Sequence, residues 1–92
     1  MKILPSALKH GISPKDIDEL LDSPLHIEIP FSYNRKGERY MYVGFVQRFD
    51  FPIEVGIDYP PNDETPRVFH ADKAREPCIS ALKGKKHGKK KK

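Results

Sequence analysis

Four segments in which apolar and polar residues alternate constrain the fold of this chain most strongly. They span residues 25–29, 39–46, 53–58 and 65–71, and segments rich in turn-forming residues separate them. Successive side chains of a strand point to opposite faces, so this period of two predicts four half-buried strands. Consecutive strands joined by short turns favour a mainly antiparallel sheet.

Helical signals flank the predicted strands. Pro5–His10 fits a short helical turn that ends before Gly11. Ser13 is placed to cap a helix over Pro14–Leu21, in which three apolar residues form one stripe. Pro77–Leu82 fits a last short helix. The order predicts a single α+β domain over residues 1–82, with N-terminal helices packed on a four-stranded sheet and a short C-terminal helix.

Charge is distributed unevenly along the chain. The formal net charge is +4, but residues 83–92 hold seven lysines and no acidic residue. Residues 1–82 then have ten basic residues against thirteen acidic ones. We therefore expect a mildly acidic domain with a disordered basic tail. The tail serves either solubility or contact with phosphate backbones. The lysines considered for such contact are Lys85, Lys86, Lys89 and Lys90.

Several classes of protein are disfavoured by composition. No run of about 18 apolar residues could span a membrane, and the N-terminus lacks the apolar run of a secretory signal. Cys78 is the single cysteine, so an internal disulfide is excluded and a reducing, cytoplasmic compartment is expected. His26 and His87 have no partner at metal-ligand spacing. We accordingly assign no metal and no other cofactor.

Three segments place cationic or imidazole side chains at the ends of predicted strands or helical turns. They are Lys9–Ser13, Gly37–Gly44 and Arg67–Arg75, with Leu21–Leu25 lying between the first two. In this order and spacing, the region from Leu8 to Arg75 resembles the BrnT-like toxins of the RelE superfamily. The resemblance implies a RelE-like fold and a cytoplasmic endoribonuclease that cleaves RNA without a metal, by attack of the 2′-hydroxyl.

The same resemblance implies partners. They are RNA, a cognate antitoxin protein, and operator DNA contacted only through the toxin–antitoxin complex, with the ribosome as a further candidate. Two other functions are compatible with the residues. One is a non-catalytic module that binds nucleic acid, and the other is an interaction protein whose role is to receive an antitoxin.

Candidate catalytic residues follow from what the reaction needs: a base, an acid and cations for the transition state. His70 is the best base or acid, while Lys73 and Arg75 can stabilise charge. Arg39 matches the arginine that opens the central strand of the family, and a guanidinium can bind two phosphate oxygens. We expect these four to converge at one end of the sheet. Asp72 stands where the family has an arginine, and a carboxylate there repels phosphate.

Candidate RNA-binding residues lie in the same segments. Lys9 and His10 could face RNA, or could instead compensate the dipole at the end of a helical turn. Arg67 could hold a phosphate. Tyr40 could stack on a base, and the competing interpretation is that it packs against a neighbouring strand. Arg39 likewise could balance an acidic neighbour rather than bind phosphate.

Overall fold

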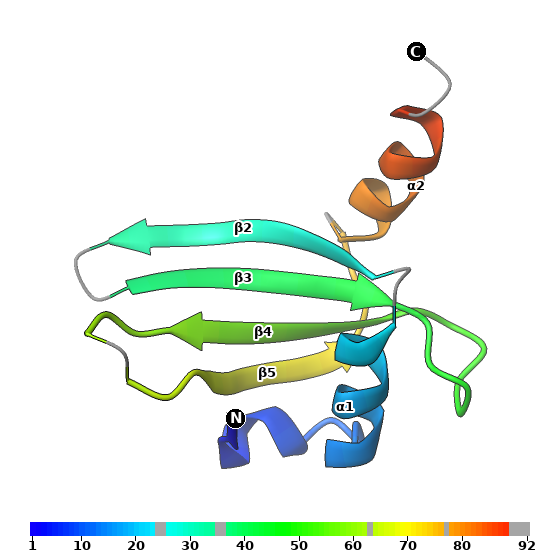
Figure 1. Ribbon diagram of the computed structural model, residues 1–92. Helices are drawn as coiled ribbons and strands as arrows, with labels where there is room; N and C mark the ends of the chain where they lie inside the picture. The colour runs from blue at the N-terminus through cyan, green and yellow to red at the C-terminus, as the bar shows by residue number, and fades with distance from the viewer. Residues whose placement is uncertain (24–25, 35–36, 63, 77, 89–92) are drawn as a thin grey trace.

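A five-stranded sheet organises the fold (Figure 1). The computed structural model describes residues 1–23, 26–34, 37–62, 64–76 and 78–88, and of residues 31–34 and 84–88 it describes the backbone only. In chain order the elements are β1 (Lys2–Ile3), the 3-10 helix η1 (Pro5–Leu8), α1 (Pro14–Asp22), β2 (Ile27–Asn34), β3 (Gly37–Gly44), β4 (Ile53–Tyr59), β5 (Arg67–Lys73) and α2 (Cys78–Gly88).

The strand order is β1-β5-β4-β3-β2, with β1 parallel to β5 and the other neighbours antiparallel. The prediction of a four-stranded sheet under N-terminal helices is therefore wrong, and the fold is mixed α/β. Only α1 is an α-helix in the N-terminal region, because the first turn is a 3-10 helix. The additional strand, β1, is two residues long and depends on partners that are distant in the sequence. Lys2 N donates to the carbonyl of Pro66, and Leu4 N to that of Val68.

The start of α1 follows the sequence signal. Ser13 Oγ accepts a hydrogen bond from Asp16 N at 3.1 Å, and Ser13 N donates to Asp16 Oδ2 at 2.9 Å, which makes a capping box. Pro14 occupies the first turn, as predicted. Gly11 precedes the cap with a φ of 82°, a conformation that glycine adopts without strain. Arg48, in the loop after β3, places Nη2 2.7 Å from Asp16 Oδ2 and so ties the helix start to the sheet.

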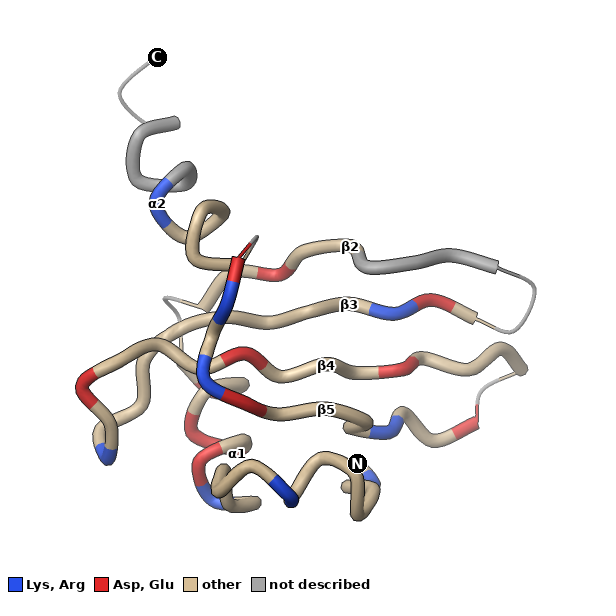
Figure 2. The backbone as a smooth tube through the Cα atoms, turned by 180° about the vertical axis from the view of Figure 1, so that it is seen from behind, with Lys and Arg blue, Asp and Glu red and all other residues tan. Residues whose placement is uncertain are grey.

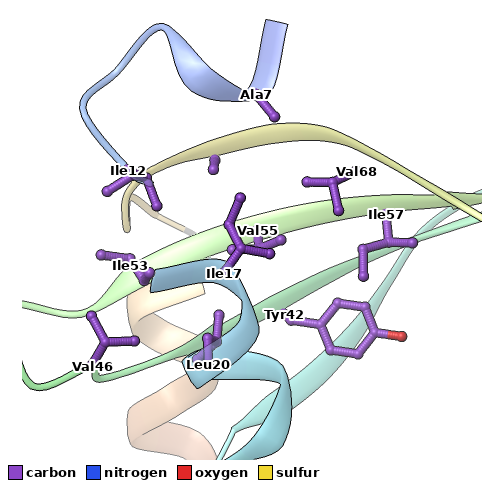
Figure 3. Packing of buried hydrophobic residues seen from close by; sticks show 11 residues of the cluster. Ala7, Ile12, Ile17, Leu20, Tyr42, Val46, Ile53, Val55, Ile57 and Val68 are labelled. Carbon is purple, nitrogen blue, oxygen red and sulfur yellow. The ribbon is translucent and has the colours of Figure 1, made fainter. Parts of the chain in front are cut away.

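The main hydrophobic core lies between α1 and the sheet (Figure 3). Ile17 and Leu20 project from α1 onto Val55 and its neighbours, and each of these three residues is at most 1% exposed. The helix approaches β3 so closely that a Cβ on Gly44 would lie 2.7 Å from Leu20 Cδ1. The other buried members are Ala7, Ile12, Tyr42, Val46, Ile53, Ile57, Val68 and Ala71.

A second, smaller cluster lies on the opposite face. The segment after β5 passes over the back of β4 and β3 on its way to α2 (Figure 2). Its Ala74, and Cys78 at the start of α2, are buried with Met41 and Val43. β3 ends at Gly44, and Phe45 directly after it is 57% exposed. Both faces of the central strand are therefore covered at this end of the sheet.

The C-terminal helix is longer than predicted. It continues past residue 84 to Gly88, whereas the sequence predicted a disordered tail from residue 83. The side chains of Lys85 and Lys86 are not among those described, and Lys89 and Lys90 lie outside the described residues. Within the described chain, no helix combines the length and the apolar character needed to cross a membrane.

Candidate functional site

A β-bulge in β5 sets the geometry of the site. Val68 pairs with Ile57 and His70 pairs with Gly56, so Phe69 is an extra residue in the ladder. A bulge can direct two neighbouring side chains to one face. Here it does, on the face opposite α1: the Phe69 ring lies over Gly56 and His70 reaches Glu54. We call this the polar face (Figure 2), and its residues are Arg39, Glu54, Gly56, Asp58, Arg67, Phe69, His70 and Asp72.

A buried carboxylate lies at the centre of this face. Glu54 is 3% exposed. It accepts hydrogen bonds from His70 Nε2 at 2.8 Å, from Arg75 Nη2 at 2.8 Å and from the Arg75 backbone N at 3.0 Å. Burial on its own would raise the pKa of Glu54, but the hydrogen bonds from Arg75 and His70 outweigh it and lower that pKa. Glu54 is therefore ionised at neutral pH and holds both partners in place.

Two contacts bear on the protonation pattern of His70, because Nε2 lies 2.8 Å from Glu54 Oε2 and 3.3 Å from Arg75 Nη2. An ionised carboxylate can only accept hydrogen bonds and a guanidinium can only donate, so the shorter contact, to Glu54, favours a proton on Nε2. In the neutral ring, Nδ1 then keeps its lone pair and is the basic nitrogen. The His70 side chain is 20% exposed, which leaves it accessible from solvent.

A second imidazole reaches the same place from the N-terminal segment. The ring centroids of His10 and His70 are 6.2 Å apart in an edge arrangement. His10 Nδ1 lies 3.8 Å from Asp72 Oδ2, an ion pair when the ring is protonated. The preceding 3-10 helix is fixed to β5, since Ser6 Oγ donates to the Phe69 carbonyl at 2.8 Å. Two of the segments noted in the sequence thus meet in space.

We call Glu54, His70, Arg75, His10 and Asp72 the glutamate cluster. With both imidazoles neutral, it carries one positive and two negative charges. Protonation of one imidazole brings the sum to zero, and protonation of both makes it positive. The attraction of this cluster for an anion therefore depends on how many of its imidazoles carry a proton.

Arg39 and Arg67 lie elsewhere on the polar face. Both flank Asp58 in the sheet register. Arg67 Nη2 is 2.8 Å from Asp58 Oδ2, and Arg39 Nε is 3.9 Å from Asp58 Oδ1. Asp58 is four residues from Glu54 along β4, which corresponds to about 13 Å. The structure therefore separates Arg39 from His70 and Arg75, with which it was expected to converge.

The remaining candidate residues are exposed or make other contacts. Lys73 is exposed, and its Nζ lies 4.9 Å from the centroid of the Phe51 ring. Tyr40 is on the α1 side of the sheet, where its ring contacts Tyr59 edge-on and its hydroxyl donates to Glu38 at 3.1 Å. Lys9 is exposed directly after the 3-10 helix, next to His10.

Among the described residues, no group of three or more His, Cys, Asp or Glu side chains could hold a metal ion. Cys78 is 5% exposed, and desolvation raises the pKa of its thiol to about 12. It therefore stays a thiol at neutral pH and is not a nucleophile.

Glu54 is the site residue that sequence reasoning missed. Alternation placed it on the polar side of its strand, but nothing local shows that the side chain is buried. The sequence does carry one signal for the bulge. The apolar residues Val68 and Ala71 are three positions apart, which breaks the period of two, and the structure buries both in the main core.

Comparison of the chain with protein-family models found no match, and a search of curated proteins found no significant similarity.

Proposed function

We propose that this protein is a metal-independent endoribonuclease that cleaves RNA by attack of the 2′-hydroxyl on the neighbouring phosphorus. One observation carries the proposal. His70 and Arg75 both contact one buried carboxylate on an accessible face, and His10, from the N-terminal segment, lies against His70. Two imidazoles and a guanidinium are the groups that this reaction needs: a base, an acid and a cation for the extra negative charge.

In the proposed reaction each group has its own role. Nδ1 of His70 takes the proton of the 2′-hydroxyl while the 2′-oxygen forms a bond to phosphorus. The bond from phosphorus to the 5′-oxygen breaks, and the imidazolium of His10 gives its proton to that oxygen. The products are a 2′,3′-cyclic phosphate and a 5′-hydroxyl, so protons and bonds balance. Asp72 Oδ2 lies 3.8 Å from His10 Nδ1 and can pair with the protonated ring that this step requires.

Arg75 supplies the positive charge. Its side chain is 63% exposed although Nη2 is held 2.8 Å from Glu54 Oε2. The hydrogen bond to Glu54 also raises the pKa of Arg75, so the group is always cationic. The carboxylate thus orients the guanidinium, and the exposed part of the fork can bind phosphate oxygens.

The biological setting of the proposal is a type II toxin–antitoxin pair in the cytoplasm. Its support is the resemblance to BrnT-like toxins, together with the meeting of Lys9–Ser13 and Arg67–Arg75 in space. A cognate antitoxin would then mask the polar face and compete with RNA.

The test is expression of the wild type and of matched variants, followed by analysis of RNA ends. We expect the wild type to arrest growth and to leave 2′,3′-cyclic phosphate ends. His70→Ala and His10→Ala should each lower cleavage about 10²–10⁴-fold with an unchanged far-UV spectrum. Lys15→Ala, an exposed cation on α1, serves as the control and should cleave like the wild type.

A second candidate function is binding of nucleic acid without cleavage. The observation that favours it is the charge of the glutamate cluster, in which Asp72 and Glu54 together outweigh Arg75 while the imidazoles are neutral. A folded wild type that binds RNA but leaves it uncut, alone and with translating ribosomes, would contradict the ribonuclease proposal and support this one.

A further inference from the structure

A second charged cluster lies on the polar face, and its excess charge is positive. Asp58 is paired in register with Arg39 on one side and Arg67 on the other, so one carboxylate serves two guanidinium groups. The side chain of Asp58 is 16% exposed, whereas those of Arg39 and Arg67 are 48% and 39% exposed. We call these three residues the arginine cluster. Both of its cations are open to an incoming anion.

An aromatic ring extends this cluster toward the proposed catalytic groups. The guanidinium carbon of Arg39 lies 4.9 Å from the centroid of the Phe69 ring. The far edge of that ring rests on Gly56, where a Cβ would come within 2.8 Å of Phe69 Cζ. A planar cation over an aromatic ring makes a flat, amphipathic surface, and bases of single-stranded RNA stack on both kinds of group.

The bulge places this surface beside the catalytic imidazole. The ring centroids of Phe69 and His70 are 6.5 Å apart, and the two side chains share one face. Along β4 the order is therefore Glu54 under His70, Gly56 under Phe69, and Asp58 between the arginines. A strand of RNA whose phosphate lies at His70 has its neighbouring nucleotide at Phe69.

The charges of the two clusters complement one another. The glutamate cluster does not attract anions while its imidazoles are neutral, because Glu54 and Asp72 outweigh Arg75. The arginine cluster has two cations and one anion at any pH near neutrality. Of the two clusters, the arginine cluster is therefore the one that contributes binding energy for a polyanion, while the glutamate cluster is left to do chemistry.

From this arrangement we infer that Arg39, Phe69 and Arg67 form a subsite for the nucleotide next to the one cleaved. The base stacks on Arg39 over Phe69, and a phosphate binds Arg67. The inference rests on the proposed ribonuclease function, because cleavage at His70 decides which nucleotide lies at Phe69. It adds the substrate class, which is single-stranded RNA longer than a dinucleotide. Bases paired in a duplex cannot stack on such a surface.

The test separates binding at the subsite from cleavage. Binding of the full chain is measured with a 2′-O-methylated single-stranded octanucleotide, which cannot be cleaved by 2′-hydroxyl attack. Arg39→Ala should weaken binding roughly 5- to 150-fold, the range for loss of one stacked base. Arg39→Lys keeps the charge but not the planar group, and should recover only a small part of that loss. Lys15→Ala is the control and should bind like the wild type.

Arg67→Ala removes a phosphate contact. The slope of log affinity against log salt should therefore become less steep by the amount that one phosphate contact contributes. Substrate length gives the second readout. A dinucleoside monophosphate has no phosphate beyond the scissile one, so Arg67→Ala should slow its cleavage less than it slows cleavage of the octaribonucleotide.

Two results would overturn the subsite. One is octanucleotide binding that Arg39→Ala leaves unchanged, or that Arg39→Lys restores in full. The other is an equal loss with both substrate lengths in Arg67→Ala, which would place Arg67 at the scissile phosphate instead. A wild type that cleaves neither substrate contradicts the proposed function alone, because binding of the methylated octanucleotide still tests the subsite.

Discussion

His70 Nε2 lies 2.8 Å from Oε2 of Glu54, a glutamate that is 3% exposed, and in our proposal this contact leaves Nδ1 of His70 as the base. Glu54 does not face the reacting atoms, so in our proposal it is a positioning residue. Its carboxylate holds the imidazole through one nitrogen and Arg75 through three hydrogen bonds to the side chain and backbone.

Glu54→Gln tests this role. The amide has one acceptor oxygen where the carboxylate has two, and its NH₂ group cannot accept from His70. We expect the rate constant of cleavage to fall roughly tenfold or more with little change in KM. In ¹⁵N NMR spectra, the fraction of neutral His70 that carries its proton on Nε2 should fall relative to the wild type. Unchanged spectra with lower activity would show that Glu54 acts in another way.

A second prediction concerns stability in acid. A hydrogen bond from Arg48 lowers the pKa of Asp16 from 3.8 to about 2. Because the folded-state pKa is the lower one, this carboxylate stabilises the fold fully above pH 3.8, and the contribution is lost as the pH falls toward 2. Urea unfolding should show a decline across this window that is smaller in Asp16→Asn. An equal decline in both proteins would contradict the assignment.

Glu54 adds to the same trend. Its pKa is also lowered, so its stabilising contribution is likewise present at neutral pH and lost in acid. The double variant with Asp16→Asn and Glu54→Gln should therefore have the flattest acid profile.

A third prediction contrasts two glycines. Gly44→Ala places a Cβ 2.7 Å from Leu20 Cδ1 in the main core, and overpacking there should lower the free energy of unfolding by about 1–3 kcal/mol. Gly56→Ala is the matched change on the polar face, where the Cβ meets the half-buried ring of Phe69. That ring can move outward, so we expect a smaller loss of stability and weaker binding of the octanucleotide. Denaturant unfolding and RNA binding measure the two effects.

Local signals in the sequence were sufficient for the elements that depend on neighbouring residues. The cap at Ser13 predicted the start of α1, and alternation predicted the strands that carry Met41 and Val55. The same signals failed where distant residues decide the structure. Lys2 and Ile3 form a strand only because they pair with the edge of β5.

The candidate site likewise contains residues that local sequence could predict and residues that it could not. His70 and Arg75 could be proposed from their chemistry and their position after a strand. Burial of Glu54 could not, because a glutamate in an alternating strand ordinarily faces solvent. Its burial is offset by hydrogen bonds from Arg75 and His70, 21 and 16 residues further along the chain. The separation of Arg39 from His70 likewise depends on strand register, which the alternation alone does not fix.

The last prediction concerns the lysine-rich end. Contact of α2 with the sheet is made through Cys78 and Ile79 at its start. Removal of residues 83–92 should therefore preserve the fold and remove seven lysines. If these lysines follow an RNA backbone, affinity falls and the slope of log affinity against log salt flattens by about 0.7 for each lost phosphate contact. The matched control replaces the seven lysines with glutamine and keeps the length of the segment. Both variants should behave alike if charge is the cause, whereas a salt slope equal to that of the wild type would leave the segment a role in solubility alone.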